Sequence, residues 1–212
     1  MSRETIFEEV KEKAGSHART ASWYRKQVRT IAKRFQDAET VMEKMQADEK
    51  KETLTDDKFQ DTNRSRTDVK KGHLYLFEYS ATMERIPYWD EFPLVYVIDH
   101  NNRSFRGANL HYMQPKYRNG IIKTLIEDNL LRVPKTTFHK YIRQGVRSRF
   151  LDLGVAEWQT AIFLPVENFV YRKQKKLYTY RKDKIWNETY TKRKDRFSMK
   201  RVIELYPGQT AE

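Results

Sequence analysis

The stretch IPYWDEFPLVYVIDHNN (residues 86–102), followed by SFRGANLHYM (residues 104–113), decides the fold of the core. Its centre, FPLVYVID, is rich in strand-forming residues, and alternate positions of a strand share one face. That face would carry Phe92, Leu94, Tyr96 and Ile98. HNNRS then favours a turn, because Asn tolerates the left-handed region. SFRGANLHYM returns as a strand, with a bulge expected at Gly107 and His111 within it. Together they predict an antiparallel β-hairpin.

A third strand is expected upstream, in HLYLFEYSA (residues 73–81). Leu74 and Leu76 would lie on one face of it, and Phe77 and Tyr79 on the other. The three strands follow one another with short connections. This order predicts an antiparallel meander or a small barrel.

Beyond Pro115 the apolar residues recur at every third and fourth position instead of every second. Residues 117–131 therefore predict an amphipathic helix. Residues 137–151 predict a second helix, interrupted near Gly145, and residues 160–164 predict a further strand that ends at Pro165. The expected fold class is α+β: a small antiparallel sheet or barrel-like core packed with helices.

Composition divides the chain into four parts. Residues 1–52 are expected to form a basic, helical N-terminal arm, and residues 53–71 form a polar linker. Residues 72–171 form the α+β core domain. Residues 172–212 form a basic, aromatic C-terminal extension, expected to be a helical or extended arm.

The excess of positive charge lies mostly in the C-terminal extension. The chain holds 42 Lys and Arg against 29 Asp and Glu, a formal net charge of +13. Residues 172–201 alone carry 13 basic and 3 acidic side chains, net +10, with aromatic residues set among them. Cations release counterions from phosphates and aromatic rings stack on exposed bases, so this composition predicts contact with nucleic acid. Alternatively, the aromatic residues dock an amphipathic helix on the core or on a neighbouring subunit, and the cations form its solvated face.

A second basic island runs from Lys13 to Phe35, with seven Lys or Arg and no acid. If residues 22–35 are helical, with Ser22 as the N-cap, cations stack on one face and apolar residues form a stripe on another. The candidate residues for binding nucleic acid or a partner are Arg25, Arg29 and Lys33 in this island, and Lys173, Lys175, Lys176, Arg181, Lys182, Trp186, Tyr190, Lys192, Arg193, Lys194 and Arg196 in the extension.

The acids and histidines of the opening stretch first suggest a metal-dependent nuclease. Such a site needs carboxylates or histidines that converge on one face, whereas Asp90 and Glu91 would point apart in a strand. We therefore expect Asp90 and Asp99 to serve turns and to lie at the surface. The sequence has no cysteine and no HExxH, GxxxxGK[ST], GxGxxG or GxSxG motif. The prediction is a protein that is not an enzyme, with no catalytic residues, no metal site and no cofactor.

Four segments resemble a known family. They are Phe77-x-Tyr79, residues 86–94, residues 107–115 and residues 158–165. All four are similar to segments of virion proteins from contractile-tailed, myovirus-type bacteriophages. The resemblance covers roughly the central half of the chain, and the chain departs from the family in its N-terminal arm and its C-terminal extension.

This family resembles the DNA end protectors of such phages, which bind the ends of the packaged genome and shield them from host exonuclease. The resemblance implies a non-enzymatic virion protein that binds packaged double-stranded DNA or its ends. The alternative is an assembly component of the neck, tail or baseplate, whose basic arms bind neighbouring virion subunits. Both readings imply a multi-subunit, symmetric assembly in the virion, synthesis in the host cytoplasm and no membrane partner.

Overall fold

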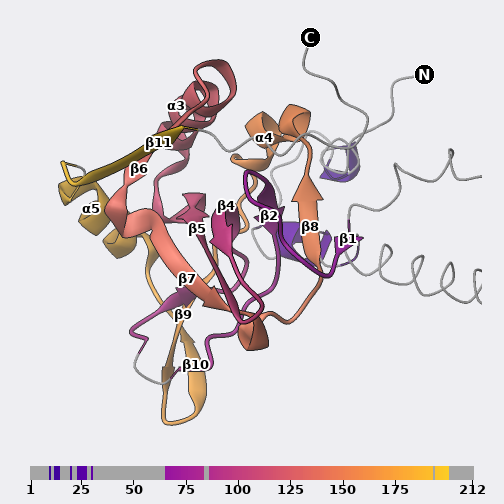
Figure 1. Cartoon of the computed structure of the whole chain (residues 1–212). Helices are drawn as coiled ribbons and strands as arrows, with labels where there is room; N and C mark the ends of the chain where they lie inside the picture. The colour runs from indigo at the N-terminus through magenta and orange to yellow at the C-terminus, as the bar shows by residue number, and fades with distance from the viewer. Residues whose placement is uncertain are drawn as a thin grey trace, which may run out of the picture.

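A six-stranded antiparallel sheet forms the centre of the protein in this computed structural model (Figure 1). The structure describes residues 10, 12–14, 20, 23–27, 30, 65–83, 86–192 and 194–200. The strand order is β1-β8-β2-β4-β5-β7. The strands are β1 (Ser65–Arg66), β2 (Leu74–Leu76), β4 (Leu94–His100), β5 (Ser104–Asn109), β7 (Phe138–Ile142) and β8 (Phe150–Leu153). The α+β class and the neighbouring strands β2, β4 and β5 are thus confirmed.

Two smaller sheets and several helices surround this centre. One sheet has the order β10-β9-β3, and the other pairs β11 with β6. Their strands are β3 (Trp89–Asp90), β6 (Leu130–Pro134), β9 (Phe169–Lys173), β10 (Lys176–Thr179) and β11 (Arg196–Lys200). The helices are α3 (Pro115–Glu127), α4 (Val155–Ala161) and α5 (Lys182–Thr191), with short 3-10 turns η1 (Leu110–Tyr112), η2 (Lys135–Thr137) and η3 (Arg143–Gly145).

The two faces of the central sheet build two different cores. Leu74 and Leu76 lie on the face that packs with Tyr96 and with the buried residues of α3 and α4. On the opposite face, Phe77 and Tyr79 join a cluster made mainly of aromatic rings. The ring centroid of Phe77 lies 5.1–5.5 Å from those of Phe105, Tyr141 and Phe150, and in each pair the rings meet edge to face. The faces predicted from the alternating pattern are confirmed, and both faces of the sheet are buried.

The β4–β5 hairpin closes through Asn101, as its turn chemistry predicts. The Asn101 side-chain oxygen accepts hydrogen bonds from the backbone N–H groups of Arg103 and Ser104, each at 2.9 Å. The pairing shifts between Val97 and Asp99, so the extra residue of the bulge lies on β4. The bulge expected at Gly107 itself is therefore wrong. Gly107 is needed for close packing, because a Cβ there would lie 2.5 Å from the Tyr96 carbonyl oxygen.

Gly107→Ala should lower the free energy of unfolding by about 1–3 kcal/mol, because the added methyl group overpacks the sheet. Its Cβ would also lie 2.4 Å from Val95 Cγ1. The matched control is Gly120→Ala in α3, where a Cβ meets nothing within 4 Å. That change should stabilise the protein by roughly 0.5–1 kcal/mol through helix propensity. Urea denaturation of both variants tests this, and equal shifts in the two would contradict it.

The helix predicted for residues 117–131 exists, but it ends earlier. Helix α3 stops at Glu127, and Asn129 takes a left-handed conformation with φ of 52°. Asn is one of the few residues that tolerate this conformation after a helix C-terminus. Leu130 and Leu131 consequently start β6, and Leu131 is fully buried.

Two other predicted elements are wrong. Residues 137–151, predicted as a helix, form η2, β7, η3 and β8 because β7 pairs with β5 and buries Tyr141 in the aromatic cluster.

Residues 160–164, predicted as a strand, include the end of α4. The Glu157 carboxylate accepts a hydrogen bond from Gly154 N–H at 3.0 Å at the start of this helix. The Trp158 indole N–H donates to the Leu153 carbonyl at 2.9 Å. These contacts close the turn between β8 and α4.

Part of the described N-terminal arm packs on the core that contains Leu74 and Leu76. Val10 is fully buried there, and Trp23 and Tyr24 pack against it. Thr20 caps the helical residues 23–27, since its hydroxyl oxygen accepts from Trp23 N–H at 3.2 Å. Ser22, the predicted N-cap, lies outside the described residues. In the part of the chain that the structure describes, no helix is long and apolar enough to cross a membrane.

Candidate nucleic-acid interface

The β9–β10 hairpin projects from the body of the protein and carries lysines at its tip (Figure 1). Lys173 pairs with Lys176, so Gln174 and Lys175 form a two-residue loop. Both loop residues have positive φ, 49° and 62°. A type I′ turn requires this and is usually built from Asn-Gly. The side chains of Lys173, Lys175 and Lys176 are all exposed, which places three cations at the end of a rigid ribbon.

The loop residues hold an unfavourable backbone conformation, which can be tested. Gln174→Asn with Lys175→Gly should raise the free energy of unfolding by about 1–3 kcal/mol, because each replaced residue costs roughly 1–2 kcal/mol in the left-handed region. Thermal unfolding would show a higher Tm. A lower Tm would mean that the loop does not hold the described conformation. Gln174→Asn alone improves the turn geometry and keeps the Lys175 charge, so it separates turn geometry from loss of charge in binding measurements.

Aromatic rings brace the base of this hairpin. Tyr88 and Tyr180 stack with centroids 4.5 Å apart, and Tyr171 and Tyr178 stack at 5.4 Å. Burial raises the pKa of Tyr88 to about 12, and the nearby Glu188 carboxylate adds to this shift. Tyr88 is therefore protonated at neutral pH and adds no negative charge to the base of the hairpin.

Helix α5 docks on the core through one face. Ile185 and Thr189 are buried, and the Trp186 indole N–H donates to the His111 carbonyl at 2.9 Å. The Lys182 ammonium lies 5.0 Å from the centre of the Trp186 ring. Trp186 therefore has the docking role that the sequence left open as an alternative.

A groove of about 530 Å³ lies between α3, α5 and the β6–β11 ribbon. Tyr117 of α3 and Tyr190 of α5 stand in its wall, with ring centroids 6.0 Å apart and planes inclined by 24°. Both rings remain exposed, at 41% and 44%. Arg132 and Arg196 line the ribbon side. The structure thus brings Trp186, Tyr190 and Arg196 together at one groove.

The other predicted residues lie at several places. The exposed ones in the extension are Lys173, Lys175, Lys176, Arg181, Tyr190, Lys192, Lys194 and Arg196. Two of these cations lie close to acids: Lys192 Nζ is 2.7 Å from Glu188, and Arg181 is 3.7 Å from Asp183. Lys182 is half-buried, as is Arg25, which lies in the helical residues 23–27. Arg29, Lys33 and Arg193 lie outside the described residues.

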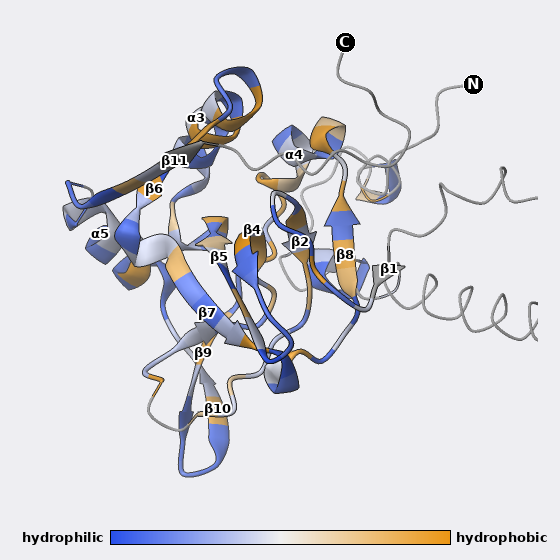
Figure 2. Ribbon diagram, in the orientation of Figure 1, coloured by the Kyte–Doolittle hydropathy of each residue, from blue (hydrophilic) through white to orange (hydrophobic). Residues whose placement is uncertain are grey.

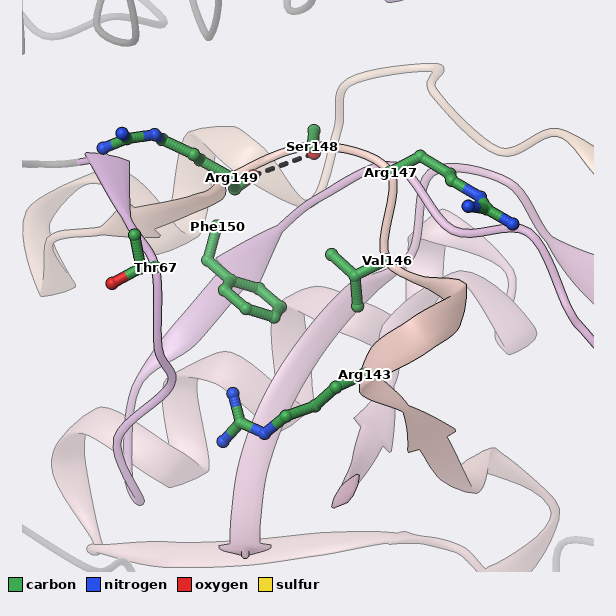
Figure 3. Close-up of a pocket in the computed structure, with 7 residues that line it drawn as sticks. All are labelled: Thr67, Arg143, Val146, Arg147, Ser148, Arg149 and Phe150. Carbon is green, nitrogen blue, oxygen red and sulfur yellow. Dashed lines mark hydrogen bonds between the residues drawn. The ribbon is translucent and has the colours of Figure 1, made fainter. Parts of the chain in front are cut away.

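A second basic surface was missed by the sequence reasoning. Arg143, Arg147 and Arg149 surround a hollow of about 320 Å³ in the η3–β8 connection (Figure 3). In this view Arg147 and Arg149 point away from each other, and Arg143 points below Phe150. Arg143 donates to Asp68 Oδ1 at 2.5 Å and to the Asn101 carbonyl at 3.0 Å. Three arginines within seven residues could have indicated this surface, but on the wrongly predicted helix Arg149 would face away from Arg143 and Arg147.

The acids of the β3–β4 region have two different environments. Asp90 is buried, so the expected surface position is wrong for it. Its carboxylate accepts from Phe92 N–H at 3.0 Å and from the Asn109 amide at 3.1 Å, and it lies 2.8 Å from His111 Nδ1. His111 belongs to η1, not to the predicted strand. Asp99 is exposed and pairs with Arg106 at 2.7 Å, as expected of a surface acid.

Asp90 therefore joins β3, β5 and η1 through its contacts with Asn109 and His111. Among the residues that the structure describes, no group of three or more His, Asp or Glu side chains could hold a metal ion. The buried acid contributes to the packing of β3 against β5 and η1.

The comparison with known families supplies the deciding observation. A family model of the phage T4 terminal DNA protecting protein matches residues 2–137, more than half of the chain. The chain belongs to this family. The match to the terminal DNA protecting proteins includes the N-terminal arm, so the departure expected there is wrong. It ends within η2, and the β9–β10 hairpin, α5 and β11 lie beyond it. No curated protein and no solved structure matches the chain.

Proposed function

We propose that this protein binds the ends of phage genome DNA and denies exonucleases access to them, as a non-catalytic component of the virion made in the host cytoplasm. The observation that carries this proposal is the match to the terminal DNA protecting family over residues 2–137. The charge distribution supports it, because the segment of net +10 lies in the hairpin, α5 and β11. The comparisons give no support to the neck, tail or baseplate alternative.

The β9–β10 hairpin is suited to the first contact with a duplex. The major groove of B-DNA is about 12 Å wide and admits a two-stranded β-ribbon. A ribbon with Lys173, Lys175 and Lys176 at its tip can follow the groove and reach phosphates on both sides. Figure 2 shows the tip of the hairpin in blue and most of α5 in blue or pale colours, whereas β4 and β8 carry orange segments beside blue ones. Contacts of this kind bind the backbone and do not select a sequence.

Protection can be measured directly. Linear duplex DNA is incubated with the full-length protein and then with a double-strand exonuclease, and intact DNA is quantified over time. We expect full-length DNA to persist once the protein saturates both ends. A duplex blocked by covalent hairpins at both ends is the control, since it has no free end to protect. Degradation at the rate of naked DNA, with the protein in excess, would contradict the proposal.

A further inference from the structure

The groove between α3, α5 and the β6–β11 ribbon combines features that suit a nucleobase. Tyr117, Ile121 and Thr124 face it from α3 at helical spacing, and Trp186 and Tyr190 face it from α5. In the ribbon, Arg196 pairs with Pro134, and Arg132 lies two positions away on the same face. Three separate elements therefore present flat rings, an apolar floor and two guanidinium groups to one hollow.

The size and exposure of the groove match a small ligand. Its volume of about 530 Å³ falls within the range of roughly 300–1,000 Å³ that is usual for small-molecule pockets. Both Tyr117 and Tyr190 expose more than 40% of their surface, so a ligand in the groove can reach both rings. Their offset stack can be extended by one more flat ring.

The groove lining holds two arginines, Arg132 and Arg196, against one acid, Asp128, so its net charge favours an anionic occupant. Arg132 and Arg196 are exposed on the ribbon side, and guanidinium groups bind phosphate oxygens in a two-pronged geometry. The segment that supplies α5 and β11 carries net +10. A nucleotide offers both a flat base for the tyrosines and a phosphate for the arginines. A base inside a continuous duplex must first be unpaired and unstacked, at a cost of about a few kcal/mol, whereas an unpaired base at an end can enter without most of that cost.

We propose that this groove takes one unpaired terminal nucleobase of the DNA end, stacked against Tyr117 and Tyr190, with the adjoining phosphate on Arg132 and Arg196. This inference rests on the proposed function and adds to it the reason why an end is preferred over internal duplex. Backbone contacts by the hairpin hold any duplex, whereas the groove is filled only at an end.

The test uses full-length protein and fluorescence anisotropy. The probe is a duplex closed by a hairpin loop, with the dye on that loop, so that only one end is free. Four free ends are compared: a one-nucleotide 3′ overhang, a one-nucleotide 5′ overhang, and the same two overhangs without their base. A base–aromatic stack changes affinity by about five- to 150-fold. We expect one of the two base-bearing overhangs to bind tighter than its abasic counterpart by that factor, which also tells the 3′ end from the 5′ end.

The double variant Tyr117→Leu, Tyr190→Leu should abolish this preference and leave the affinity for the abasic overhangs within about twofold, because the phosphate contacts remain. The matched control is Phe163→Leu, an exposed aromatic residue outside the groove at 57% exposure, which should keep the preference. The single variant Tyr117→Leu leaves α5 unchanged, so a loss of preference in this variant cannot come from misfolding of α5. Equal binding of all four ends, or a preference that survives the double variant, would overturn the inference alone. Failure to bind any of the four would overturn the proposed function as well.

Discussion

Replacing both Lys175 and Lys176 by Glu should weaken binding to linear duplex DNA on the order of 50-fold at 0.1 M salt. Each phosphate neutralised by a cation contributes a slope of about −0.9 to the plot of log affinity against log salt concentration, so two lost contacts remove nearly two decades. The same change should make that slope shallower by about 1.8. Both lysines are exposed at the hairpin tip, so the fold should tolerate the change.

The matched control is the variant Lys123→Glu, Lys140→Glu, which has the same net charge. Both residues are exposed, Lys123 on α3 and Lys140 on β7. Affinity of the control should fall by less than about threefold, because only the overall field changes. Equal losses of affinity in the two variants would show that the hairpin has no specific part in binding. An unchanged affinity in the hairpin variant would show that the hairpin does not contact DNA.

Glu167→Leu should lower the free energy of unfolding by about 3–5 kcal/mol. Removal of one partner of a buried ion pair leaves the other charge without compensation. Arg118 is fully buried and donates to Glu167, to the Met113 carbonyl at 2.9 Å and to the Ile162 carbonyl at 3.0 Å. Burial works to raise the pKa of Glu167, but the charges of His111 and Arg118 outweigh it and lower the pKa, so the acid is ionised and the pair is charged.

The double variant Arg118→Met, Glu167→Leu should recover part of this loss, since it removes both buried charges but also removes the donor to the Met113 and Ile162 carbonyls. Glu127→Gln is the surface control: its partner Lys123 lies 3.9 Å away and both side chains are more than half exposed. It should change stability by less than about 1 kcal/mol. Urea denaturation measures all three. A double variant as unstable as Glu167→Leu alone would show that packing, not charge, sets the cost.

Alternating patterns predicted the central strands correctly because the residues of β2 and residues 94–97 of β4 point into one of two buried cores. Leu74 and Leu76 meet the helices, and Phe77 and Tyr79 meet other aromatic rings. The same method failed where distant pairing overrides local preference. Residues 138–142 look helical by spacing, but β5 offers them a ladder of backbone hydrogen bonds. No local pattern states that such a partner exists.

The sequence predicted which segment supplies the candidate site, but not how its residues are arranged in space. Counting charges pointed to the extension, which supplies the hairpin, α5 and β11. The turn at Gln174 and Lys175 escaped prediction because neither residue favours positive φ. The groove escaped it as well, since Tyr117 and Arg132 come from the core and meet Tyr190 and Arg196 only after folding. The four domain boundaries and the DNA-binding roles of the extension residues stay predictions.

The central claim, recognition of DNA ends, is tested most directly by competition. A labelled linear duplex bound to the full-length protein is challenged with equal masses of one plasmid, either as a relaxed closed circle or cut once by a blunt-end nuclease. The two competitors differ only in having ends. We expect the cut plasmid to displace the probe at a concentration at least tenfold below that of the circle. Equal displacement by the two forms would contradict the claim and would leave only general DNA binding.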